Sequence, residues 1–148
     1  MLGKSTLEAA RILSICETLK ELAEAFSSLV PFGSTPTAEA LDTFFTGGAK
    51  DATGPAGSDR TRYLTWFLGR LEAQLTGTGV AVGSDLSLAD VSMFSLFCDN
   101  LTASDVFCSK ERTDAAIAAF PKISASVTAV AANANIQKWL ATRGPQGF

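Results

Sequence analysis

Histidine is absent from this 148-residue sequence, and its absence excludes several kinds of chemistry at once. A Ser-His-Asp or Cys-His catalytic group and a histidine metal site all require an imidazole, which this chain does not contain. The three cysteines, Cys16, Cys98 and Cys108, are an odd number without the spacing of a metal site. We therefore expect no metal site, and we expect Cys16 and Cys98 to be small core residues in the cytoplasm or another reducing compartment.

Long apolar runs and clustered positive charge are also missing. No apolar run reaches the roughly 18 residues that a membrane span needs. The N-terminus contains Lys4 and Glu8 instead of the apolar stretch of a signal peptide. The net charge is −3, and the lysines and arginines are scattered along the chain. We expect neither a membrane span nor a nucleic-acid partner, and the length suits one domain over residues 1–148.

What the sequence does contain is a series of helix signals. Apolar residues spaced three and four apart, together with proline and glycine at the ends, predict an all-α helical bundle. The predicted helices run over 5–30, 36–46, from Ser58 or Asp59 to 75, 87–98, 110–120 and 121–132, with a last short helix that ends at Thr142. Aromatic residues at core spacing include Trp66, Phe67 and Trp139, and Tyr63 is placed within a helix.

Two glycine-containing stretches are predicted as connections. Residues 47–58 lack both a Gly-Lys-Ser/Thr signature and a preceding strand, so a flexible connecting loop is favoured over a phosphate-binding loop. Residues 77–83 are the one β-like stretch and are predicted as an extended loop that leads into the most apolar helix.

The strongest local signal surrounds the start of that apolar helix. Ser87 is placed as the N-cap and Asp90 three residues later, which is a capping box with aspartate in the Glu/Gln position. Leu86 and Val91 occupy the positions of a hydrophobic staple. Asp90 could instead be a catalytic carboxylate, but its spacing from Ser87 favours the structural cap. A second capping box is predicted at Ser5 and Glu8.

These residues carry a resemblance to a known family. The stretch Gly83-Ser-Asp-Leu-Ser-Leu-Ala-Asp90 resembles the capping box and staple of the glutathione transferase C-terminal domain. The tail from Phe120-Pro121-Lys122-Ile123 to Trp139 and Arg143 is similar to the closing pattern of that domain. The start at Leu2-Gly3-Lys4 resembles the entry to its first helix. The resemblance covers nearly the whole chain and implies the family's helical bundle.

The resemblance also implies candidate binding residues. In sigma-like glutathione transferases, an acidic residue on the first helix of this domain reaches across the dimer to the amino group of glutathione, and Glu21 matches it. Lys20 stands where metal-sensitive members have a carboxylate. The alternative is that Glu17, Glu21 and Glu24 form an ordinary solvated face.

Four further positions match the lining of the family's hydrophobic acceptor site: Ala23, Ser92, Leu96 and Phe148. Small residues at Ala23 and Ser92 would leave a roomy pocket. Leu96 could equally be a core residue.

The family binds glutathione mainly on an N-terminal thioredoxin-like domain, which also supplies the group that stabilises the thiolate. The chain starts where that domain would end, and it contains no βαβ pattern. The resemblance therefore implies an acceptor-site and dimer-face domain that is inactive alone, with a thioredoxin-like domain or a second copy as partner and glutathione as co-substrate only. The alternative is a non-catalytic interaction module that uses the same fold to bind other proteins.

Overall fold

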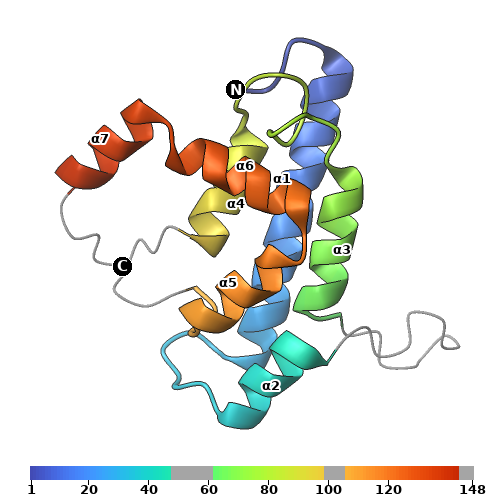
Figure 1. The fold of residues 1–148 in the computed structure, drawn as a ribbon. Coiled ribbons are helices and arrows are strands. Elements are labelled where there is room, and N and C mark those ends of the chain that lie inside the picture. Colours follow the sequence, from blue (N-terminus) through green and yellow to red (C-terminus); the bar gives the residue numbers. More distant parts are fainter. Residues whose placement is uncertain (48–61, 99–105, 144–148) are drawn as a thin grey trace, which may run out of the picture.

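The computed structural model describes residues 1–47, 62–98 and 106–143, and these residues form seven α-helices without a strand (Figure 1). The helices are α1 (Thr6–Leu29), α2 (Ala38–Thr46), α3 (Leu64–Gln74), α4 (Leu88–Phe97), α5 (Lys110–Ala118), α6 (Pro121–Ala131) and α7 (Ala134–Thr142). The prediction of an all-α fold is confirmed.

Helix α4 lies at the centre of the bundle, where α1 and α6 pack against it. The buried residues of α4 are distributed along its length and include Ala89, Met93, Phe94 and Phe97. The sequence places few polar groups on this helix, so its side chains can be enclosed without leaving unpaired donors or acceptors. The position of α4 therefore sets the positions of α1 and α6.

An aromatic cluster closes the opposite end of the core from the start of α4. Phe44 of α2 contacts Phe26 of α1 with ring centres 4.9 Å apart, and it contacts Phe107 at the same distance. Phe107 also lies 6.2 Å from Phe97 at the end of α4. Edge-on and tilted rings of this kind combine a large buried area with favourable quadrupole contacts. The cluster thereby ties α1, α2 and α4 to the segment that precedes α5.

Helix α6 begins as the sequence predicts, with Pro121 in its first turn after the end of α5. Its N-cap residue, Phe120, has no side-chain acceptor, and a carboxylate from another helix takes that role. Glu72 of α3 accepts from the amides of Lys122 at 2.9 Å and Ile123 at 3.1 Å. This contact satisfies two of the amides that a helix start leaves open, and it joins α3 to α6.

Several predicted positions are wrong. Helix α3 does not extend back to residues 62 and 63, because Tyr63 is extended and is the N-cap of a helix that starts at Leu64. Burial of the Tyr63 side chain, which is 4% exposed, outweighs the local helix signal. Ser58, Asp59 and most of the predicted 47–58 loop lie outside the described residues. Helix α2 starts at Ala38 behind a Thr37 cap, not at Pro36, because Thr37 Oγ1 accepts from the Ala40 amide at 3.1 Å.

Two expectations about burial also need correction. Trp139 is 48% exposed on α7, where the guanidinium of Arg143 covers one face of its ring. Cys16 and Cys98 pack against the core but are only partly buried, and Cys108 is exposed. Partial burial raises the pKa of the Cys16 thiol because it disfavours the charged thiolate.

Candidate functional site

The carboxylate of Asp90 is fully buried at the start of α4 and accepts four hydrogen bonds. Its Oδ2 atom accepts from the amide of Ser87 at 2.8 Å and from the Ser87 hydroxyl at 2.6 Å. Its Oδ1 atom accepts from the amide of Ala81 and from the hydroxyl of Ser126, both at 2.6 Å. The capping box is therefore present, as predicted. The two further donors make Asp90 the point where the 77–83 loop and α6 are attached to α4.

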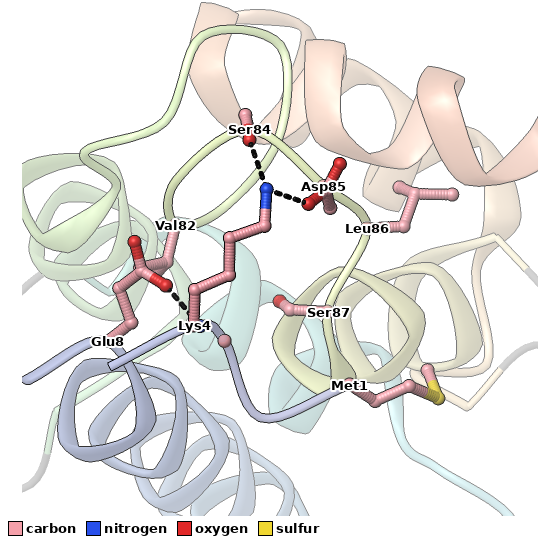
Figure 2. Close-up of a pocket in the computed structure, with 9 residues that line it drawn as sticks. Met1, Lys4, Glu8, Val82, Ser84, Asp85, Leu86 and Ser87 are labelled. Carbon is pink, nitrogen blue, oxygen red and sulfur yellow. Dashed lines mark hydrogen bonds and ion pairs between the residues drawn. The ribbon is translucent and has the colours of Figure 1, made fainter. Parts of the chain in front are cut away.

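The N-terminal segment contributes another contact to the start of α4 (Figure 2). The carbonyl of Met1 accepts from the amide of Leu88 at 2.9 Å. The ammonium of Lys4 lies 2.5 Å from Asp85 and 3.2 Å from the hydroxyl of Ser84. This ion pair raises the pKa of Lys4 and lowers that of Asp85. Residues 1–4 thus lie across the loop that leads into α4.

Glu8 takes part in the second predicted cap and also contacts Gly83. Ser5 Oγ accepts from the Glu8 amide at 3.2 Å, as a capping box requires, but the Glu8 carboxylate accepts from the amide of Lys4 instead of that of Ser5. Gly83 lies directly against this carboxylate with φ of +71°, and a Cβ there would be 3.1 Å from Glu8 Oε1. The left-handed backbone conformation favours glycine at this point, and a larger residue would also have to displace the Glu8 side chain by a few tenths of an ångström.

A hollow of about 310 Å³ lies at the C-terminal end of α1. Its wall is mostly apolar and includes Phe26, Val30 and Val106, with Cys108 also lining it. Ala23 lines the same hollow from α1, and its small side chain leaves the space open. At the same site lies Phe32, which is 98% exposed. Its volume is at the lower end of the range for small-molecule sites, and its mostly apolar wall suits a small apolar molecule.

The other residues predicted for the acceptor site are placed differently. Ser92 is partly buried on α4, and its hydroxyl lies 3.8 Å from the Cys16 sulfur on α1. Cys16 precedes Ala23 by seven residues, so Ser92 lies beside the same face of α1 but outside the lining of the cavity. Leu96 is partly buried against the core, and Phe148 lies outside the described residues.

Glu21 lies on an exposed face of α1 together with Glu17 and Glu24. Its carboxylate forms no ion pair with another residue in the described ranges, whereas Glu24 lies 4.0 Å from Lys20. The side chain is thus available to a ligand or to another chain. Its role toward glutathione stays a prediction.

Sequence reasoning missed most of the cavity wall. Pro31 and Phe32 follow α1 directly, and their cavity partners Val106 and Cys108 are more than 70 residues away. The available sequence signal was the run Val30-Pro31-Phe32, which places apolar side chains directly after the end of a helix.

The sequence matches the model of a known protein family. Residues 42–143 match the model described as "Glutathione S-transferase, C-terminal domain". The chain belongs to this family. The matched residues run from α2 to the residue after α7, so they include α4 and its capping box. A search of curated proteins and a search of solved structures each gave no match.

Membership of the glutathione S-transferase C-terminal domain family agrees with the helical bundle and with the sequence resemblance. In the described parts of the chain, no helix is both long and apolar enough to cross a bilayer. The family match concerns the domain as a whole and does not by itself assign a role to any of its side chains.

Proposed function

We propose that this chain is the acceptor-site and dimer-face domain of a glutathione transferase-like protein of the sigma type. The observation that carries the proposal is the apolar cavity at Ala23, which coincides with a position that the resemblance assigns to the hydrophobic acceptor site. An apolar electrophile would be held there by burial of its surface, and glutathione would be presented to it by a thioredoxin-like domain.

The proposal gives the chain a binding role and leaves activation of the thiol to the thioredoxin-like domain. A free thiol with a pKa near 8.5 is only a few per cent ionised at neutral pH, so conjugation needs a group that stabilises the thiolate. Tyr63, the one tyrosine in the sequence, is buried at the N-cap of α3 and does not line the cavity at Ala23. Glu21 could orient glutathione across a dimer, but its negative charge would disfavour a nearby thiolate.

Binding of a hydrophobic dye tests the acceptor site. We expect anilinonaphthalene sulfonate to gain fluorescence with the wild-type chain and to lose most of this signal with Ala23→Phe, because the new ring would fill the cavity. The matched control is Ala115→Phe, which adds the same ring at an exposed position of α5. Equal dye binding by the Ala23→Phe variant and the wild type would show that the cavity is not the site.

A further inference from the structure

A second cavity, of about 210 Å³, lies between α1 and α3. The residues that line it include Arg11 and Ser14 of α1 and Gln74 at the end of α3. Figure 1 shows these two helices side by side. Arg11 and Ser14 are three residues apart, so they lie one turn apart on the same face of α1. A guanidinium, a hydroxyl and a carboxamide therefore meet at one cavity, which is separate from the cavity at Ala23.

A hydrogen bond between α1 and α3 orients the carboxamide of Gln74. The hydroxyl of the buried Thr18 donates to the side-chain carbonyl of Gln74 at 3.4 Å and to the backbone carbonyl of Ser14 at 3.0 Å. This contact uses the carbonyl oxygen of Gln74, and the amino group of the same carboxamide donates to no described residue. Because that amino group can only donate, Gln74 offers N–H donors beside the cavity.

The guanidinium of Arg11 forms no ion pair, hydrogen bond or ring contact within the described ranges. The other described arginines each have a partner: Arg62 and Arg70 stack on Trp66, Arg112 pairs with Asp42, and Arg143 covers the ring of Trp139. The Ser14 hydroxyl also bonds to no residue of the described ranges. The cavity wall thus brings together one positive charge and several donors that the described residues leave unused.

The negative groups on the same two helices have partners of their own. Glu72 of α3 accepts from the amides at the start of α6, and Glu8 of α1 accepts from the amide of Lys4. The ammonium of Lys122 donates to the backbone carbonyls of Glu72 at 3.4 Å and Leu75 at 2.9 Å. A cation therefore covers the negative end of the α3 dipole, and an anion would not have to displace any of these carboxylates from Arg11.

We propose that this cavity binds the carboxylate of a small organic acid. The Arg11 guanidinium takes both carboxylate oxygens as a bidentate pair, while Ser14 and Gln74 donate to the same oxygens. The volume equals that of roughly seven water molecules, which limits the ligand to a small body. Leu7 lies one turn before Arg11 on the same face of α1 and is 61% exposed, so it can cover an apolar part of the ligand. Binding here requires neither glutathione nor the cavity at Ala23.

Titration with benzoate at constant ionic strength, followed by ¹⁵N–¹H NMR of the whole chain, tests the site. We expect saturable shifts of the amide signals around Arg11, Ser14 and Gln74. Arg11→Gln should weaken benzoate binding by about tenfold or more, because it removes charge-assisted hydrogen bonds to the carboxylate. Lys20→Gln is the matched control. It removes one positive charge from another exposed position of α1, and it should leave the affinity within about twofold of the wild type.

Two further probes separate the parts of the ligand. Benzyl alcohol has the ring without the charge, and inorganic phosphate has the charge without an apolar body, so each should bind about fivefold or more weakly than benzoate. Ala23→Phe should bind benzoate like the wild type, because Ala23 lines the other cavity. The proposal is overturned by an absence of saturable shifts, by shifts confined to the surroundings of Ala23, by unchanged affinity in Arg11→Gln, or by either comparison probe binding as tightly as benzoate.

Discussion

Replacing Asp90 with alanine is expected to lower the free energy of unfolding by about 3–5 kcal/mol. The substitution would leave the amides of Ala81 and Ser87 and the hydroxyls of Ser87 and Ser126 without their acceptor at a fully buried point. Each buried donor left unpaired costs about 1–3 kcal/mol, and the four costs are not independent because the donors share one carboxylate. Chemical denaturation followed by circular dichroism measures the loss.

Two further variants make this prediction decisive. Ser126→Ala removes one of the four donors and should cost about 1–2 kcal/mol, so it remains measurable if the Asp90→Ala chain does not fold. Asp114→Ala removes an exposed carboxylate on α5 and should change stability by less than about 0.5 kcal/mol. An Asp90→Ala protein that unfolds like the wild type would show that the capping network does not stabilise α4.

Replacing Phe44 with alanine is expected to cost about 3–5 kcal/mol, a loss similar to that at Asp90. Phe44 is fully buried between Phe26, Phe45 and Phe107, so the change removes a large apolar side chain and leaves a cavity in the aromatic cluster. Helix α2 should lose its attachment to α1 first, because Phe44 and Phe45 are its buried residues.

Phe32→Ala is the matched control for this substitution. It deletes the same ring at a position that is 98% exposed, so stability should stay within about 0.5 kcal/mol of the wild type. The two variants can be compared by thermal unfolding under identical conditions. Similar melting temperatures for Phe44→Ala and the wild type would contradict the role of the cluster.

Local signals were enough to predict most of the fold. Ser87 and Asp90 lie three residues apart, so the start of α4 can be read from a short stretch of sequence, and Pro121 marks the start of α6 in the same way. The start of α3 could not be predicted like this. The extended backbone at Tyr63 follows from burial of its ring among distant residues, which no local pattern reveals.

The same difference between local and long-range contacts applies to the candidate sites. The contact between Asp90 and Ser87 is local and was predicted, whereas the contact between Asp90 and Ser126 joins residues 36 apart and was not. Ala23 was predicted as an acceptor-site residue from the family resemblance. The cavity around it is formed by segments that meet only in the folded chain. At Trp139 the local pattern was misleading. Its helical spacing predicts a core residue, but no residue of α7 is fully buried.

The rate of glutathione conjugation by the 148-residue chain tests the central claim most directly. With a generic electrophile at neutral pH, we predict a rate no higher than the uncatalysed reaction, because the proposed function leaves stabilisation of the thiolate to a thioredoxin-like domain. Joining a thioredoxin-like domain to the chain should produce activity, and Glu21→Ala should then weaken glutathione binding more than it slows turnover. Turnover by the chain alone, well above the uncatalysed rate, would contradict the account.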